Sequence, residues 1–261
     1  MPRDERPQRP ERVTPEPPVA GDPKPASLHD VLRLLSEGEM ELLGRLPRSS
    51  NFAFLAEVQH PDRSTLAVYK PRDGETPLWD FPDGTLYRRE MAAFVLAEAF
   101  GWPGVPPTVV RTGPFGPGSV QLFVDADPEE HFFTLRDARL DDFAPVALFD
   151  VVVNNADRKA GHCLLGLDGG IWVVDHGTCF AATPKLRTVI WEFAGEPVPQ
   201  PLLGDVRRVA DQLRDGPVRE SLAALLDPME VEATAKRAAA LVATARFPEP
   251  GPGRPYPWPP V

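Results

Sequence analysis

The chain has 261 residues, of which 42% are hydrophobic and 25% charged, so it can bury a core and is not disordered throughout. Its 38 acidic and 28 basic side chains give a net charge of -10, which disfavours nucleic acid and anionic lipid surfaces as partners. Two cysteines are too few for a disulfide framework, and no run of about 18 apolar residues suggests a membrane span. We therefore expect a soluble, cytoplasmic protein with no nucleic-acid partner and no integral membrane segment.

Proline is unevenly distributed along the chain. Of the 33 prolines, eight lie in residues 1–27 and seven in residues 248–261. We expect a disordered Pro-rich tail at 1–27 and a second Pro-rich tail at 248–261, either of which could offer an extended segment to a protein partner. The folded part is then about 28–247.

The first half of that part predicts a small antiparallel sheet interrupted by one helix, here called the N-lobe (28–126). Apolar spacing predicts a first helix, and a helix that ends at Gly101 follows a Pro/Gly/Trp-rich insertion. In chain order the expected elements are a helix at 28–43, strands at 44–47, 52–58 and 65–70, the insertion at 71–84, a helix at 85–100, and strands near 109–110 and 120–124.

The second half predicts a mainly helical C-lobe (127–247) with one β-hairpin. A strongly apolar helix runs into a polar loop, and two short strands flank the tight turn Asp168-Gly169-Gly170. The expected elements are helices at 143–154, 203–213, 218–226 and 229–245, with the hairpin strands at 163–165 and 171–174. The fold class expected from this order is α+β with two lobes.

Lys70 is a candidate for chemistry because the chain uses 23 arginines and only five lysines. Strand alternation places it on one face with Leu66 and Val68, which we take as a face turned toward the core. A lysine on that side needs an anion, and Glu90 in the following helix could supply one. The alternative is a lysine at a strand end that extends its ammonium to solvent.

Acidic residues end two further apolar elements. Asn155 after the helix at 143–154 has an ordinary explanation as a helix cap, but the Asp157 carboxylate meets the unfavourable end of the helix dipole. Asp175-His176-Gly177 ends the hairpin, where a carboxylate followed by glycine suits a divalent cation. An exposed Asp157–Arg158 pair and a simple turn are the alternatives at these two places. Zinc is disfavoured because His162 and Cys163 are adjacent on a strand and point to opposite faces.

In their order, Lys70, Glu90, Asp157-Arg158 and Asp175-His176-Gly177 resemble the protein-kinase-like superfamily. The closest resemblance is to its phosphatidylinositol 3-/4-kinase-like branch, including a group of actinobacterial proteins. The loop from Phe149 to Leu165 is similar to type II phosphatidylinositol 4-kinases and more distantly to HipA-type kinases. The resemblance covers about 38–245 and is carried by four segments: Tyr69-Lys70-Pro71, Trp79 to Thr85, Asn155 to Arg158, and Lys185 to Thr188.

The resemblance implies a kinase that binds ATP with Mg²⁺ or Mn²⁺ and phosphorylates an unknown hydroxyl on a lipid, a protein or a small molecule. Asp157 would be the general base, with Arg158 and Lys70 also in the catalytic group, and the candidate metal-binding residues are Asp175 and His162. The residues expected around the nucleotide are Ser49, Ser50, Asn51, Lys70, Glu90, Gln121, Phe123 and Val124.

His162 departs from the family pattern because an asparagine usually binds a second metal at this position. An imidazole is a weak ligand for Mg²⁺. This leaves three alternatives: one metal ion is enough, Mn²⁺ replaces Mg²⁺, or His162 hydrogen-bonds a phosphate and binds no metal. The departure leaves two alternatives to a kinase: a nucleotide-binding pseudokinase or scaffold module without turnover, and a nucleotidyl transferase.

Overall fold

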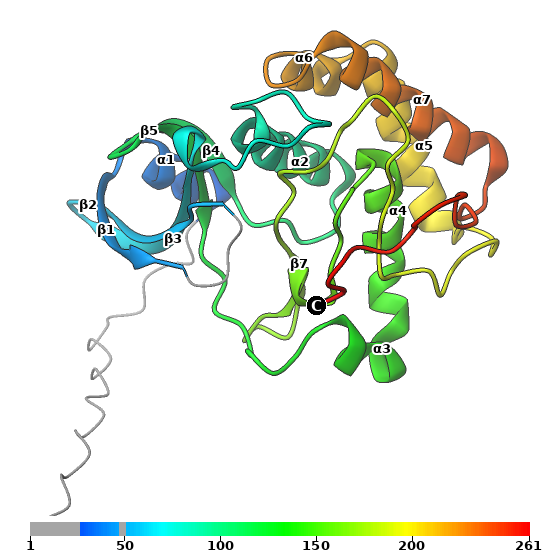
Figure 1. Cartoon of the computed structure of the whole chain (residues 1–261), viewed down its shortest axis with the longest axis horizontal. Coiled ribbons are helices and arrows are strands. Elements are labelled where there is room, and N and C mark those ends of the chain that lie inside the picture. Colours follow the sequence, from blue (N-terminus) through cyan, green and yellow to red (C-terminus); the bar gives the residue numbers. More distant parts are fainter. Residues whose placement is uncertain (1–26, 47–50) are drawn as a thin grey trace, which may run out of the picture.

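The computed structural model describes residues 27–46 and 51–261. The expected tail at 1–27, apart from Ser27, and the candidate residues Ser49 and Ser50 lie outside the described residues. A five-stranded antiparallel sheet lies at one end of the described part and most helices lie at the other (Figure 1). The expected α+β class is confirmed.

The sheet has the strand order β1-β2-β3-β5-β4, and every neighbouring pair is antiparallel. Helix α1 (Leu28–Glu37) contacts β2, β4 and β5, while α2 (Leu86–Phe100) contacts β4 and β5 on one side and α5 and α6 on the other. Helix α2 therefore connects the sheet with the helical part. The strands are β1 Glu39–Arg45, β2 Phe54–His60, β3 Arg63–Pro71, β4 Thr108–Gly113 and β5 Gly116–Leu122.

The helical part surrounds α4, which is apolar on nearly all sides and buried along most of its length. A two-stranded hairpin, β6 and β7, packs beside it. The elements are α3 Phe132–Arg139, α4 Ala144–Val153, β6 Cys163–Leu165, β7 Ile171–Val173, α5 Gln200–Arg214, α6 Pro217–Ala223 and α7 Pro228–Thr244, with short 3₁₀ turns at Arg72–Gly74, Leu140–Phe143 and Ala160–His162. No helix among the described residues has both the length and the apolar character needed to cross a bilayer.

The expected first helix was too long. Helix α1 ends at Glu37, and residues 39–45 form β1 in place of a helical turn followed by a strand at 44–47. Met40 and Leu42 are half-buried and alternate with the exposed Glu39 and Glu41, which is the period of a strand. The leucines of this stretch fit the period of a helix as well as that of a strand, and the alternating glutamates are what indicate a strand.

The segment 248–261 differs from the linker-like tail expected from its prolines. It lies across the helical part, and two of its carbonyls accept backbone hydrogen bonds from elements far away in the sequence. Pro255 O accepts from Thr188 N at 3.0 Å, and Pro260 O accepts from Ala160 N at 2.8 Å. Proline cannot donate to a sheet, but its carbonyl still accepts, which is how a Pro-rich segment can be held in place.

Candidate active site

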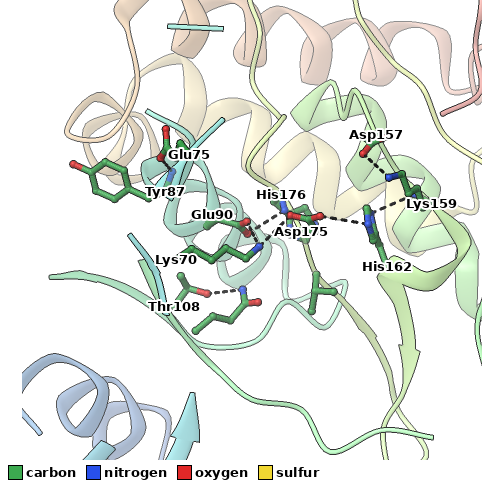
Figure 2. Close-up of polar contacts among 12 residues, drawn as sticks. Lys70, Glu75, Tyr87, Glu90, Thr108, Asp157, Lys159, His162, Asp175 and His176 are labelled. Atoms are coloured by element: carbon green, nitrogen blue, oxygen red, sulfur yellow. Dashed lines mark hydrogen bonds and ion pairs between the residues drawn. The ribbon is translucent and has the colours of Figure 1, made fainter. Parts of the chain in front are cut away.

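Lys70 lies near the end of β3, and its ammonium contacts two carboxylates from distant elements (Figure 2). Its Nζ is 2.5 Å from Glu90 Oε1 on α2 and 3.0 Å from Asp175 Oδ1, two residues after β7. The other oxygen of Glu90 accepts the backbone N–H of His176 at 3.0 Å. Glu90 therefore binds both the lysine and the turn that carries Asp175.

The face of β3 that carries Lys70 is not the core face. Ala67 and Tyr69 are the buried residues and pack toward α1, whereas Leu66 is exposed and Val68 and Lys70 line a cavity. The sequence showed that side chains of β3 alternate between two faces, but not which face packs in the core. The wall of a cleft can be as apolar as a core, so both faces look alike in the sequence.

Lys70, Glu90 and Asp175 are called the Lys70 group below. The opposite charges of Lys70 and Asp175 stabilise each other. Burial would lower the pKa of Lys70, but Asp175 and Glu90 more than offset this effect and raise it above its ordinary value. The Lys70 ammonium in turn lowers the pKa of Asp175 well below its ordinary value. At neutral pH Lys70 is thus a charged ammonium and Asp175 an ionised carboxylate.

Asp175 adopts a left-handed backbone conformation with φ 62°, which is uncommon for a residue other than glycine. Its side chain is half-exposed, and its Oδ2 is 3.3 Å from His162 Nε2. Burial lowers the pKa of His162 to about 4, so the imidazole is neutral at pH 7. Its Nδ1 accepts a long 3.4 Å hydrogen bond from the Lys159 backbone, so the hydrogen of the neutral ring is on Nε2.

Asp157 belongs to the loop after α4. Helix α4 ends at Asn154 with φ 53°, so Asn154 is the cap, although the sequence suggested Asn155. Asn155 instead accepts the backbone N–H of Asp157 at 3.0 Å through its side-chain oxygen. Burial raises the pKa of Asp157 above its ordinary value, and the positive charges of Lys159 and Arg187 oppose that rise.

Asp157 and the Lys70 group line one small cavity. The same cavity is bordered by Asn51, whose side-chain oxygen accepts the Thr76 backbone N–H at 2.7 Å. The structure therefore brings together five of the expected site residues: Lys70, Glu90, Asp157, Asp175 and Asn51.

Arg158 points away from this cavity although it was expected in the catalytic group. Its side chain has no exposed surface, and Nε and Nη2 bind the Asp150 carboxylate of α4 at 3.0–3.1 Å. Nη1 donates to Val174 O at 3.0 Å, and Nη2 lies 2.8 Å from His176 Nε2. Arg158 thus connects α4 with two acidic loops, the loop that carries Asp157 and the loop that carries Asp175.

A larger cavity of about 390 Å³ adjoins the Lys70 group on the sheet side. Its lining includes Gln121, Phe123 and Val124, which were expected around the nucleotide, together with Val68 and His162. The Gln121 amide is buried and donates to Thr108 Oγ1 at 2.8 Å, so its hydrogen bond lies within the sheet.

Two charged residues next to the site, Lys159 and Glu75, were not predicted from the sequence. Lys159 Nζ is 3.3 Å from Asp157 Oδ2, and its rarity in an arginine-rich chain was a usable signal. Glu75 accepts the backbone N–H groups of Leu86 and Tyr87 at 3.1 and 2.8 Å and so caps α2. Nothing in the sequence marked Glu75, because it lies in the irregular insertion before that helix.

The donor atoms of the site suit a single hard cation. Among the described residues no three His, Cys, Asp or Glu side chains converge as a ready-made metal cluster. The half-exposed Asp175 carboxylate offers oxygen ligands, which Mg²⁺ and Mn²⁺ prefer. His162 Nδ1 accepts from Lys159 N, so in the neutral ring Nε2, which lies 3.3 Å from Asp175 Oδ2, carries the hydrogen and has no free lone pair for a cation.

Comparison with curated proteins finds a close relative. Protein Rv2133c of Mycobacterium tuberculosis is 40% identical over 264 residues, covering 87% of this chain and 94% of the relative. The chain belongs to the family of this mycobacterial protein. A second relative, phosphatidylinositol 4-kinase gamma 4 of Oryza sativa, is 32% identical over 164 residues, which are 49% of this chain but only 29% of the rice protein. No family model matches the sequence.

Solved structures identify the fold. The Golgi casein kinase with Mn/ADP bound superposes with a TM-score of 0.57 at 14% identity, covering 84% of this chain and 75% of that one. The Helicobacter pylori proinflammatory kinase CtkA superposes with a TM-score of 0.50 at 10% identity, covering 81% and 95%. This chain therefore has a protein-kinase-like fold, which confirms the resemblance inferred from its sequence motifs.

Proposed function

We propose that this protein is an ATP-dependent phosphotransferase that acts on an alcohol. The observation that carries the proposal is the meeting of the Lys70 ammonium with the carboxylates of Glu90 and Asp175 beside Asp157. Phosphoryl transfer needs little covalent help from a protein, and its catalysis is mostly positioning and charge stabilisation. A fixed ammonium and a separate carboxylate on one cavity are the groups that such catalysis requires.

In this proposal Lys70 binds phosphate oxygens of ATP. Its pKa is raised, so the ammonium is charged throughout the physiological range. Glu90 is almost fully buried and keeps the ammonium in place, while the half-exposed Asp175 is free to exchange its bond with Lys70 for other partners. Asp175 is the residue that would hold Mg²⁺ or Mn²⁺, which neutralises phosphate charge when bound.

Asp157 accepts the proton of the acceptor hydroxyl. Its raised pKa makes it a better base than an exposed aspartate, and its backbone is fixed by Asn155. Lys159, beside it, supplies positive charge where the phosphoryl group passes. We assign His162 the task of orienting Asp175 through its Nε2–H, and Arg158 that of positioning both acidic loops.

The nucleotide base fits the cavity on the sheet side. Val68, Phe123 and Val124 supply apolar surface there, and the cavity adjoins Lys70, which places a base and its phosphates in one continuous space. A structural neighbour, the Golgi casein kinase, was solved with Mn/ADP bound, which supports the binding of a nucleotide by a protein with this fold.

The test compares Asp157→Asn with the wild type and with Asp137→Asn, an exposed aspartate on α3. Each protein is incubated with γ-labelled ATP and Mg²⁺ or Mn²⁺, and label transfer and ADP release are measured. Loss of a general base should lower turnover by about 10²- to 10⁴-fold in Asp157→Asn, with no change in the control. Equal turnover in all three proteins would remove Asp157 from the mechanism.

Thermal denaturation with ATP separates the alternatives. Stabilisation of the wild type by ATP without turnover would favour a nucleotide-binding module over an enzyme. Retention of the α-phosphate of ATP on the product would indicate nucleotidyl transfer instead. Absence of stabilisation by any nucleotide would contradict the whole assignment.

A further inference from the structure

A second groove is lined by residues 184–187, a segment that is hydrogen-bonded to the loop of Asp157. It has a volume of about 470 Å³ and runs between the segment after Thr183 and the C-terminal segment 248–261. Its lining carries three basic side chains and one acidic one, in a protein whose net charge is -10. These charged residues are Lys185, Arg187, Arg254 and Glu249. The groove is thus a basic patch on an acidic protein.

One end of the groove is hydrogen-bonded to the loop that carries Asp157, the proposed general base. The backbone N–H of Arg187 donates to Asn155 O at 2.8 Å, and Arg158 N donates to Arg187 O at 3.0 Å. The positive charge of Arg187 also opposes the rise in the pKa of Asp157. A molecule held at Arg187 is therefore within electrostatic reach of Asp157.

The wall contributed by the C-terminal segment is fixed. Thr188 N and the indole Nε1 of Trp191 both donate to Pro255 O, at 3.0 and 3.2 Å. Further along, Pro260 O accepts the backbone N–H of Ala160, three residues after Asp157. Arg254 is therefore held next to the loops of the active site, although it lies almost 100 residues away from Asp157 in the sequence.

The basic side chains differ in whether their charge is already used. Lys185 Nζ is 2.6 Å from Asp80 and lies over the ring of Trp79, so it holds the 71–84 insertion in place. Arg187 and Arg254 have no side-chain hydrogen bond or ion pair with any residue that the structure describes, and the Arg254 guanidinium lies over the ring of Trp258. Two guanidinium groups are therefore available to a ligand in the groove.

We propose that this groove binds a phosphate group of the acceptor alcohol through Arg187 and Arg254. The inference rests on the proposed function and names the chemical class of its acceptor, a hydroxyl compound that is already a phosphate ester. One arginine satisfies both oxygens of a carboxylate, whereas a phosphate has enough oxygens for two guanidinium groups. The volume suits a small molecule or a lipid headgroup.

The binding test uses the full chain and glycerol 3-phosphate, followed by NMR of the arginine Nε–H groups. Glycerol 3-phosphate should shift the signals of Arg187 and Arg254, which are assigned with the variants Arg187→Gln and Arg254→Gln, and glycerol should not. Each variant should weaken binding about tenfold or more, as expected for loss of a charge-assisted hydrogen bond. The control Arg207→Gln, in a separate groove between α5 and α7, should bind normally.

A parallel arm identifies the source of the phosphate. Phosphatidylcholine vesicles with and without phosphatidylglycerol are sedimented with the wild type and with Arg254→Gln. Arg254-dependent binding to the vesicles that contain phosphatidylglycerol supports a lipid source, and the same dependence with glycerol 3-phosphate alone supports a soluble one. No Arg254-dependent binding in either arm, or equal weakening by Arg207→Gln, would overturn the proposal.

The two proposals can fail separately. Phosphate binding at Arg187 and Arg254 in a protein that never consumes ATP would support the groove and contradict the phosphotransferase. ATP turnover that depends on Asp157 in a protein that binds no phosphate ester would do the reverse.

Discussion

Replacing Arg158 by methionine should strongly destabilise the fold. The substitution removes the bonds to Asp150 at 3.0–3.1 Å and to Val174 O, in a site with no exposed surface on either charged partner. The Asp150 carboxylate would keep only the Asn155 amide at 2.9 Å and a long 3.4 Å contact with the Thr188 hydroxyl. Breaking a buried pair on one side costs about 3–5 kcal/mol.

Urea and thermal denaturation measure this cost. At about 2–4 °C of Tm for each kcal/mol in a chain of this size, Arg158→Met should lower Tm by about 6–20 °C. Arg214→Met is the matched control, because Arg214 forms an exposed pair with Asp211 at 2.9 Å and should cost less than about 1 kcal/mol. A loss in Arg158→Met no larger than in the control would refute the buried-pair argument.

Three further predictions concern the cleft and its borders. Lys70→Met should abolish the ATP-induced rise in Tm and lower turnover at least about 100-fold, because it removes the phosphate-binding ammonium; an unchanged rise would contradict this. Lys159→Met and Arg187→Gln should each move the acid limb of the pH–rate profile to higher pH, because each removes a positive charge that lowers the pKa of Asp157. The shift should be larger for Lys159→Met. A shift to lower pH in either variant would contradict this account of the Asp157 pKa. Truncation after Phe247 should cost about 1–3 kcal/mol in urea denaturation, because it removes the carbonyls that accept from two loops and an indole; an unchanged midpoint would show that the segment is a free tail.

The order of charged residues along the chain predicted much of the site. Lys70, Glu90 and Asp175 were singled out as an ammonium ending a strand, a carboxylate in the next helix and a carboxylate after a hairpin, and they meet at 2.5 and 3.0 Å. Such residues are costly at the ends of apolar elements unless they have partners, so their positions carry information. The two-lobed α+β arrangement followed from periodicity in the same way.

The sequence could not show which way a charged side chain points. Arg158 and Asp157 are neighbours, yet one is fully buried and the other borders the cavity. Asp150, the partner of Arg158, lies eight residues earlier on a helix that reads as apolar, and nothing local connects the two. His162 likewise reads as a metal ligand in the sequence, and only the structure shows that its Nδ1 accepts from the Lys159 backbone while its Nε2 lies 3.3 Å from Asp175 Oδ2.

Segments defined by composition were the least predictable. Seven prolines made 248–261 resemble a linker, but the fixing contacts come from its carbonyls, which every residue has. The missed helix α3 (Phe132–Arg139) is short and mixes aromatic with charged residues, so no apolar period of several turns marks it. Both elements are held by tertiary contacts rather than by local preference.

The buried pair of Arg158 and Asp150 offers a way to separate stability from catalysis. An apolar pair of similar size is often as stable as a buried ion pair, so the double variant Asp150→Leu with Arg158→Met should recover most of the stability lost by Arg158→Met alone. Methionine cannot donate to Val174 O, however, and that carbonyl is one residue before Asp175, while Arg158 itself follows Asp157. The spacing of the two acids would then no longer be fixed, and turnover should fall well below the wild-type value although the protein is folded and still stabilised by ATP. Turnover at the wild-type level in the double variant would show that packing alone positions the two loops and that the charge pair serves stability.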